Sequence, residues 1–232
     1  MENTNMLYRE VSALRFKDNS KKRIKEVVPY DVEFLLKINE KTKKYRITPK
    51  SLKAFTIGYL FGNGIVKSLK NIHELKIDGK TIIVKVNKDS LPLSPVKSKL
   101  KISTEDVFES FKSLEKNAKI WKITGGTHIA GLISDGNKIF EEDISRHAAI
   151  DKVLGHGILK NLNFSESFVV YSGRVSDSLI LKLTRLGIPI VISNAAPMYS
   201  ALSLAKDYNI TIVGFVRDRR FNVYTCPHRI SL

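Results

Sequence analysis

Polar and apolar residues alternate through much of the first 87 residues, and this period of two is typical of half-buried β-strands. The polar and basic opening predicts one strand after a loose lead-in. Two later pairs of short alternating runs predict hairpins, the second around Asp78-Gly79, a strong two-residue turn signal. The stretches are 1–26 for the first strand, 30–38 with 43–47 for the first hairpin, and 72–77 with 81–86 for the second.

A helical spacing of apolar residues interrupts this strand pattern. Thr48 and Pro49 predict a helix start, with Thr48 as the N-cap, and the helix is expected to stop near Gly62. It carries Leu52, Phe55, Leu60 and Phe61. We therefore predict that residues 1–87 form a small strand-rich unit with one helix.

Residues 88–103 hold two prolines and four serines in a basic span, which predicts a linker or mobile loop. Ser103 and Asp106 then resemble a capping box, and the helix they open buries Val107, Phe111 and Leu114 on one face. This helix starts a second predicted unit, an α/β domain over residues 104–232.

Three apolar runs without alternation follow in the second unit, at residues 168–172, 188–193 and 210–215. Helices separate them, one capped by Ser176 and ending at Gly187, the other opening at Pro197. Strands alternating with helices, and lacking a polar face, predict parallel strands covered on both sides. The sequence thus favours a three-layer α/β domain.

The stretch from Thr124 to Asp151 concentrates polar chemistry in what reads as a hairpin feeding a helix. Its glycine pair offers bare backbone N–H groups to an anion, although a tight turn explains the same pair. Glu142 and Asp143 precede the helix, where their negative charges also interact favourably with the positive end of its dipole. The candidate binding residues of this stretch are Gly125, Gly126, Thr127, His128, Arg146, His147 and Asp151, with His147 and Asp151 spaced to touch and Ser145 as N-cap.

Right-handed crossovers place the carboxyl ends of the three predicted strands on one edge, where open α/β sheets bind ligands. The residues expected there are Ser172, Gly173, Arg174, Asn194, Phe215, Val216, Arg217, Asp218, Arg219 and Arg220. The guanidinium group of an arginine can bind a phosphate through two parallel hydrogen bonds. The alternative is that these arginines cap helices and remain solvated.

Composition narrows the classes of function. A chain of 232 residues that is 43% hydrophobic can bury a core, and no apolar run is long enough to span a bilayer, so we expect a cytosolic protein. The net charge of +16 favours anionic partners, but scattered lysines without a basic helical stripe argue against nucleic acid. One cysteine, Cys226, and five histidines disfavour a metal site.

The segments TGGTHIAG, EDISRHAAIDKVLG, SGRVSDSLILK and VGFVRDRRFNVYT, in this order, resemble the formate dehydrogenase accessory protein family, FdhD. TPKSLKAFTIGYLFGNGIV resembles the family's N-terminal signature, and the resemblance covers residues 25–230. It implies a fold similar to cytidine deaminase without the zinc. It also implies binding of the molybdenum or tungsten pterin guanine dinucleotide cofactor, Mo-bis(molybdopterin guanine dinucleotide) or its tungsten analogue, with residues 215–220 in the cofactor segment. A cysteine desulfurase would supply sulfur, and formate dehydrogenase would receive the cofactor.

The chain departs from the family pattern where the sulfur chemistry is expected. Members carry a Cys-x-x-Cys loop shortly before the TGGTH motif, and residues 88–103 contain no cysteine. Persulfide transfer needs a thiolate, which serine cannot replace. Ser145, Ala148 and Asn63 also replace usual family residues. Two hypotheses stay open, a cofactor-binding accessory protein that takes part in sulfuration and a non-enzymatic carrier that has lost it. A deaminase-like hydrolase is disfavoured because the zinc ligands are absent.

The apolar helix that includes Leu52 and Phe61 suggests a further hypothesis about assembly. The strand-rich unit beside it is too small to bury it alone, which predicts a homodimer.

Overall fold

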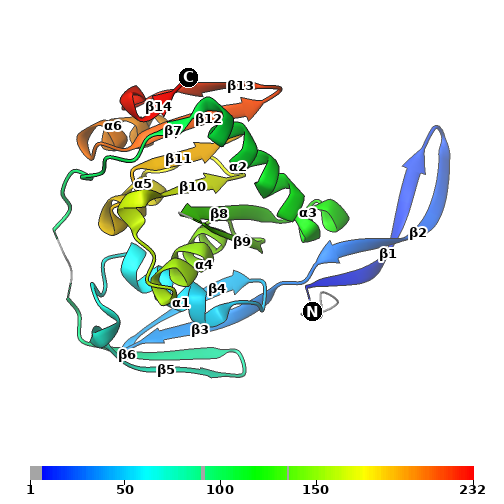
Figure 1. Cartoon of the computed structure of the whole chain (residues 1–232). Coiled ribbons are helices and arrows are strands. Elements are labelled where there is room, and N and C mark those ends of the chain that lie inside the picture. Colours follow the sequence, from blue (N-terminus) through cyan, green and yellow to red (C-terminus); the bar gives the residue numbers. More distant parts are fainter. Residues whose placement is uncertain (1–6, 90–91, 135) are drawn as a thin grey trace.

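The computed structural model describes residues 7–89, 92–134 and 136–232. A six-stranded sheet in the order β13-β12-β11-β10-β8-β9 forms its centre (Figure 1). The strands β10, β11 and β12 are parallel, and β8, β9 and β13 run antiparallel to their neighbours. Their bounds are β8 His128–Ser134, β9 Asn137–Asp143, β10 Ser167–Tyr171, β11 Ile190–Ser193, β12 Thr211–Arg217 and β13 Arg220–Val223. The prediction of three parallel strands is confirmed.

Helices cover both faces of this sheet. Val169, Val191 and Ile212 face one core, beneath α4, α5 and α6. Phe168 and Val213 face the other core, beneath α2, so alternate strand residues serve the two layers. The bounds are α2 Thr104–Asn117, α3 Lys119–Thr124, α4 Arg146–Leu159, α5 Asp177–Leu186 and α6 Tyr199–Asp207. The predicted three-layer α/β architecture is confirmed.

Most predicted helix ends in this domain are also present. Ser103 and Asp106 form the capping box of α2, Ser145 caps α4, and Ser176 caps α5, which ends at Gly187. The start of α6 was predicted too early. Pro197 pairs with Val175 in a β-bridge, so the chain stays extended there and the helix begins at Tyr199.

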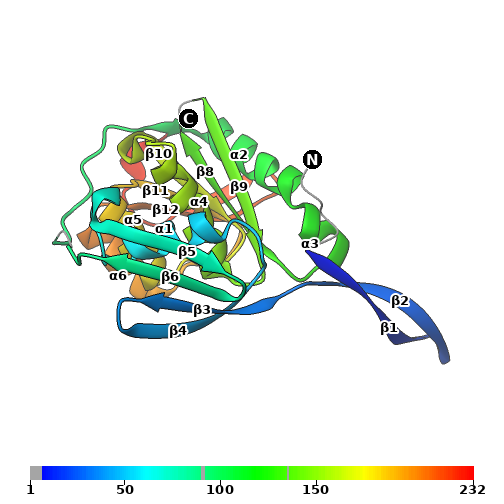
Figure 2. The ribbon, with the colours of Figure 1, turned by 90° about the horizontal axis from the view of Figure 1, so that it is seen from below.

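The N-terminal unit is a four-stranded sheet in the order β4-β3-β6-β5 (Figure 2). The helix α1, Leu52–Gly62, packs on this sheet and, through its other side, against α4. The strands are β3 Val32–Ile38, β4 Lys41–Ile47, β5 Ile72–Asp78 and β6 Thr81–Val86, which confirms both predicted hairpins. Because α4 of the same chain buries α1, the reason first given for a homodimer no longer holds.

Thr48 is not the N-cap of α1, as was predicted. The helix starts at Leu52, after Ser51, which has a left-handed φ of 55°. Thr48 lies three residues before this N-cap, where its N–H and hydroxyl donate to the buried carboxylate of Asp143 and its hydroxyl oxygen accepts from the Lys152 ammonium.

Residues 8–29 form two strands rather than the one predicted over residues 1–26, and the lead-in at residues 1–6 lies outside the described residues. The strands β1, Tyr8–Lys17, and β2, Ser20–Pro29, make a separate two-stranded sheet that projects from the body (Figures 1 and 2). Asp18 and Asn19, at φ 44° and 59°, make the tight turn between them. We call residues 8–29 the arm.

Residues 92–103, the larger described part of the predicted linker, run along the domain (Figure 1). Val96 is buried in the main core, and its N–H donates to the carbonyl oxygen of Tyr208. Short elements complete the chain, namely β7 Ile102–Ser103, β14 Ile230–Ser231 and the 3-10 turns Leu69–Asn71, Phe164–Glu166 and Pro227–Arg229. Within the described ranges, no helix has the length and apolar character that crossing a membrane requires.

Candidate functional site

A groove runs along α2 at the carboxyl ends of β10, β11 and β12. It consists of two adjoining cavities of about 880 and 510 Å³, whose linings share Phe111, Lys112, Glu115 and Asn194. The larger cavity reaches Gly125, Gly126, Thr127, His128 and Ser172, and the smaller one reaches Val216, Arg217 and Asp218. The fold thus brings nine of the predicted binding residues, from four separate segments, to one surface.

Glu142 holds the glycine loop at one end of the groove. Its carboxylate accepts hydrogen bonds from the N–H groups of Ile120 and Trp121, each at 2.8 Å, and from the hydroxyl of Thr127 at 3.0 Å. The acid therefore caps the start of α3 and fixes the loop that follows the helix, whose C-cap is Gly125 with a φ of 66°. Sequence reasoning related Glu142 to α4 instead, because only the fold brings β9 beside α3.

The strand ends carry their own polar scaffold. The Ser172 hydroxyl accepts from the N–H of Ile129 at 2.9 Å, which joins β10 to β8. Ser193 donates its hydroxyl to the Gly173 carbonyl at 2.8 Å and so joins β11 to β10. Asn194 follows, and its side-chain oxygen is buried without a hydrogen-bond partner in the part of the chain that is described. A buried acceptor without a donor is costly in a folded protein, so this oxygen is suited to a ligand.

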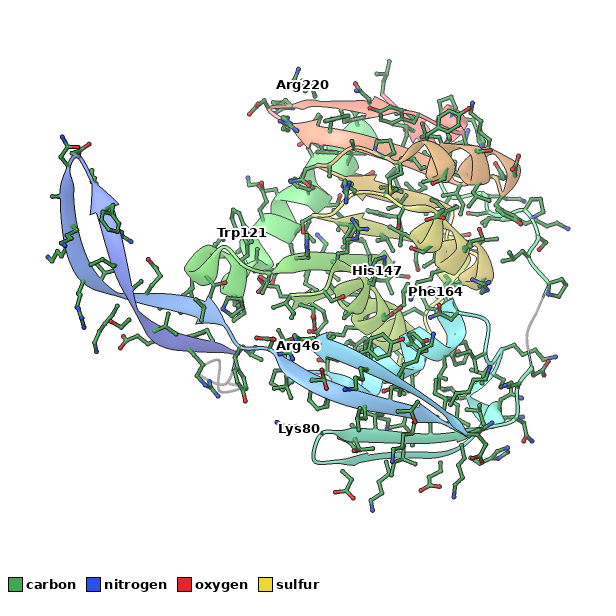
Figure 3. The ribbon with its side chains drawn as sticks, turned by 180° about the vertical axis from the view of Figure 1, so that it is seen from behind. Arg46, Lys80, Trp121, His147, Phe164 and Arg220 are labelled. Atoms are coloured by element: carbon green, nitrogen blue, oxygen red, sulfur yellow. The ribbon has the colours of Figure 1, made fainter. Side chains whose placement is uncertain are left out.

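Only one of the three arginines predicted at residues 217–220 lines the groove. Arg217 does so, donating weakly to the Asn194 carbonyl at 3.4 Å and lying 5.7 Å from the ring of Phe215. The Arg219 side chain is 80% exposed and pairs with Glu105 at the surface. Arg220 is exposed at the far tip of the β12–β13 hairpin (Figure 3). The backbone explains the difference, because Phe215 has a left-handed φ of 55° at a bulge, and Asp218 and Arg219 form the turn.

A cationic cluster surrounds His128 beside the glycine loop. Burial lowers the pKa of His128, and the charge of Arg146 lowers it further, against a smaller opposing effect of Asp143. Burial, followed by Arg146, Lys182 and His128, likewise lowers the pKa of His147, whose Nε2 lies 3.3 Å from the Ser178 hydroxyl. A lowered pKa favours the neutral form of each imidazole, which can both donate and accept hydrogen bonds with a bound ligand.

Tyr171, at the end of β10, is almost fully buried below these groups. Burial raises the pKa of Tyr171, and the charges of Arg146 and Arg174 oppose that rise. Five further predicted site residues are not among the groove-lining residues, namely Arg146, His147, Gly173, Arg174 and Phe215.

Asp151 lies in the protein interior rather than in the groove. It is 2% exposed and hydrogen-bonds Lys182 on α5, while His147 bonds Ser178. Burial raises the pKa of Asp151, and the Lys182 charge opposes this. The four-residue spacing of His147 and Asp151 predicted that the two side chains could touch. In the structure each instead contacts a residue of α5, Ser178 for His147 and Lys182 for Asp151.

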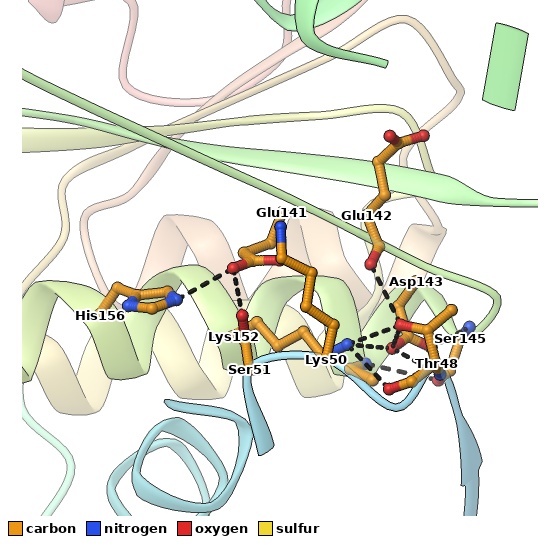
Figure 4. Close-up of polar contacts among 10 residues, drawn as sticks. Thr48, Lys50, Ser51, Glu141, Glu142, Asp143, Ser145, Lys152 and His156 are labelled. Atoms are coloured by element: carbon orange, nitrogen blue, oxygen red, sulfur yellow. Dashed lines mark hydrogen bonds and ion pairs between the residues drawn. The ribbon is translucent and has the colours of Figure 1, made fainter. Parts of the chain in front are cut away.

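The other acids of the same motif connect the two halves of the chain (Figure 4). Asp143 on β9 pairs with Lys152 on α4 at 2.6 Å, with both side chains fully buried, and Thr48 donates to the same carboxylate oxygen at 2.9 Å. Glu141 accepts from Ser51 at 2.5 Å and lies 3.0 Å from Nε2 of His156. Burial raises the pKa of Glu141, but the bonds to His156 and Ser51 outweigh it and leave that pKa below its ordinary value.

The α2 and α3 residues of the groove were not predicted as binding residues. The groove wall includes Lys112, Glu115, Lys116, Trp121 and Lys122. The polar face of α2 was visible in the sequence, but without the fold that face cannot be distinguished from solvated surface. Within the described residues, no group of three or more His, Cys, Asp or Glu side chains is arranged to hold a metal ion.

Cys226 lies at the opposite end of the sheet from Arg217. Its carbonyl oxygen accepts from the hydroxyl of Thr211, the first residue of β12, whereas Arg217 is the last. Six residue steps along a strand span about 20 Å. The thiol is therefore remote from the groove.

Comparison with known proteins gives a match between residues 87–231 and the model of the FdhD/NarQ family. "Sulfur carrier protein FdhD" of Methanothermobacter thermautotrophicus is 38% identical, over 97% of this chain and 99% of the relative. The protein of the same name from Shouchella clausii is 31% identical, over 94% and 95%. The crystal structure of a putative formate dehydrogenase accessory protein from Desulfotalea psychrophila superposes with a TM-score of 0.86 at 26% identity, covering 97% of this chain and 99% of that one.

Proposed function

The chain belongs to the FdhD/NarQ family, and from this premise we propose that it acts in the maturation of formate dehydrogenase. The groove along α2 would bind the molybdenum or tungsten pterin guanine dinucleotide cofactor as cargo for that enzyme. Two relatives are named sulfur carriers, and the similar crystal structure is described as a formate dehydrogenase accessory protein, which supports this role.

The observation that carries the cofactor proposal is the pairing of Asn194 and Arg217 on one groove wall. The Asn194 amide oxygen is a buried acceptor awaiting a donor, such as the N–H groups of a guanine base. Arg217 offers a guanidinium fork for phosphate. The larger cavity, at about 880 Å³, lies within the size range of small-molecule sites. The net charge of +16 would further favour a polyphosphate ligand.

Arg217→Ala is expected to weaken GDP binding by about ten- to a hundredfold, because one charged hydrogen bond contributes roughly 1.5–3 kcal/mol. The melting temperature should not change appreciably, since Arg217 is exposed and its hydrogen bond to the Asn194 carbonyl is long. Titration calorimetry with GDP and a thermal scan on the same variant measure both quantities.

Arg220→Ala is the matched control, because Arg220 lies on the same hairpin but outside the groove. It should bind GDP about as tightly as the unaltered protein. Equal affinities for the unaltered protein and Arg217→Ala would exclude the proposed site. A loss of stability along with affinity would make Arg217 a structural residue.

A non-enzymatic cofactor carrier is the second candidate function, and two observations favour it. The segment at residues 88–103 has no cysteine, and Cys226 is at the far end of β12 from Arg217. A persulfide on Cys226 would be about 20 Å from a ligand held by Arg217. A cysteine desulfurase partner remains a prediction from the family resemblance, and a cytoplasmic location remains a prediction from the composition of the chain.

Cys226→Ala is expected to leave the binding free energy for GDP within about 1 kcal/mol of its original value, because the thiol is remote from the groove and makes at most weak hydrogen bonds. Calorimetry tests this. Incubation of the unaltered protein with a cysteine desulfurase and cysteine, followed by mass spectrometry, tests the carrier hypothesis separately. A persulfide on Cys226 would contradict that hypothesis and show that sulfur chemistry has moved to a different thiol.

A further inference from the structure

A separate cavity of about 480 Å³ lies at the carboxyl end of α1 and shares no lining residue with the groove. Its lining comes from β3, β4, the end of α1 and the segment that follows β6. The β3–β4 turn lies beside it, at the end of the N-terminal sheet farthest from the arm (Figures 1 and 2). Its volume is within the range of small-molecule sites, so the lining side chains indicate which class of molecule it could hold.

Two lysines stand on the covered face of the N-terminal sheet. Lys41 pairs across the strands with Ile38, and Lys43 pairs with Leu36. Residues paired in this way point to the same face, and Leu36 and Ile38 are 1% and 8% exposed in the core beneath α1. A covered sheet face is normally apolar, so two cations on this face depart from the pattern and call for an explanation.

The end of α1 does not need these lysines as caps. Basic side chains often hydrogen-bond the last carbonyl groups of a helix. In α1, however, the last four carbonyl oxygens already accept hydrogen bonds from other donors, Tyr59 from Asn63, Leu60 from Ile65, Phe61 from Gly64 and Gly62 from Arg185. Lys41 and Lys43 are therefore available to a ligand.

Tyr59 joins the cations to the apolar part of the cavity. Its residue is 7% exposed, and its hydroxyl oxygen accepts from the Lys43 ammonium at 3.1 Å. Burial, followed by a hydrogen bond to Tyr59, raises the pKa of Tyr45. Tyr45 therefore keeps its proton and can donate it to the same oxygen, which leaves the Tyr59 proton for a ligand. A hydroxyl that accepts from a cation is also the stronger donor.

The positive charge around the cavity is not neutralised. Lys41, Lys43 and Lys88 line it, and none of them has a carboxylate partner among residues 7–89, 92–134 and 136–232. Asp89 also contributes to the lining, but its carboxylate pairs with Lys67 at 2.9 Å. A concave site with several cations of one sign attracts anions.

We propose that this cavity binds a small anion with an apolar body, of the class of a medium-chain carboxylate. The three lysines and the Tyr59 hydroxyl would hold the anionic head. The tail would lie against the apolar side chains of the lining, those of Leu36, Ile38 and Ile65. A bare anion would leave these side chains in contact with water, and a neutral molecule would leave the lysines without a partner. The site does not depend on the proposed function of the groove.

Titration calorimetry with octanoate tests the site, and acetate and octylamine are the comparisons. Octanoate should bind with a stoichiometry of one per chain. Acetate has the same head without the tail and should bind about a hundredfold more weakly or less, because the buried methylene groups supply that part of the affinity. Octylamine has the same tail with a positive head and should not bind.

Variants assign the binding to this cavity. Lys43→Gln should weaken octanoate binding about tenfold, because it removes a charged hydrogen bond to the head. Tyr59→Phe keeps the ring, removes the hydroxyl and should weaken binding several-fold. Lys37→Gln is the matched control, because Lys37 lies between Leu36 and Ile38 on β3 but is exposed on the opposite face. It should bind octanoate as the unaltered protein does, and a thermal scan checks that each variant is folded.

Each other result would overturn the proposal. Absence of octanoate binding would exclude the site, equal binding of octylamine would exclude the role of charge, and equal binding of acetate would exclude the apolar tail. Equal affinities for Lys43→Gln, Tyr59→Phe and Lys37→Gln would place octanoate elsewhere, as would its displacement by GDP. If GDP fails to bind, the proposed function of the groove is contradicted, whereas the octanoate result stands.

Discussion

Lys152→Ala is expected to lower the free energy of unfolding by about 3–5 kcal/mol, because it leaves the buried carboxylate of Asp143 without its cation. Both side chains are fully buried, and the Lys152 ammonium also donates to Thr48. The pair joins β9, α4 and the segment before α1, so its loss loosens the contact between the two units (Figure 4). Urea unfolding followed by circular dichroism measures the change.

Lys160→Ala is the control for this prediction, because Lys160 is exposed at the end of the same helix. Its effect should stay within about 0.5 kcal/mol. Replacing Asp143 and Lys152 together by apolar residues of similar size should recover much of the loss, since an unpaired charge is then no longer buried. If Lys152→Ala alone unfolds at the same urea concentration as the unaltered protein, the pair does not stabilise the fold.

Gly155→Ala is expected to lower the free energy of unfolding by about 3 kcal/mol or more, because α1 and α4 cross there with their backbones in contact. A Cβ atom on Gly155 would lie 1.8 Å from the carbonyl oxygen of Ala54, and one on Gly58 would lie 1.8 Å from that of Asp151. Backbone atoms on both sides leave no flexible group to move aside. The helices would have to separate, exposing the apolar surface of α1.

Gly62→Ala, at the end of α1, is the matched substitution. Its nearest neighbours are methylene carbons of Lys182 at 3.0–3.5 Å, which can shift, so the loss should be about 1 kcal/mol or less. Equal losses for Gly155→Ala and Gly62→Ala would mean that the close crossing of the helices is not what makes Gly155 necessary.

Local patterns predicted much of the fold. The turn at Asp78-Gly79, the capping box of Ser103 and Asp106, and the caps Ser145 and Ser176 all depend on residues within a few positions of one another, and the structure contains them. Thr48 was assigned as an N-cap from the same kind of local pattern, and that assignment was wrong. Its local pattern suits a cap, but its hydroxyl is engaged by Asp143, 95 positions later, and by Lys152.

The groove residues were predicted from the rule that the carboxyl ends of parallel strands lie at one edge of a sheet. Whether each residue lines the groove depended on local geometry as well. Parallel strands brought Ser172, Asn194 and Arg217 to one edge. The rule does not predict the direction of a side chain that follows a strand. It therefore could not show that Arg217 lines the groove and Arg220 does not. Here the bulge at Phe215 and the turn at Asp218 made that distinction.

The sequence by itself determined most of the order of strands and helices after residue 29, the parallel core and the family, because periodicity, capping and linear motifs are properties of neighbouring residues. The tertiary structure alone decided which charged groups meet. In the fold, Asp143 pairs with Lys152 and Asp151 pairs with Lys182. Glu142 accepts from the backbone at the start of α3. Those pairings join segments far apart in the chain, and their strength depends on burial that only packing creates. The groove arises in the same way, from α2 lying across the strand ends.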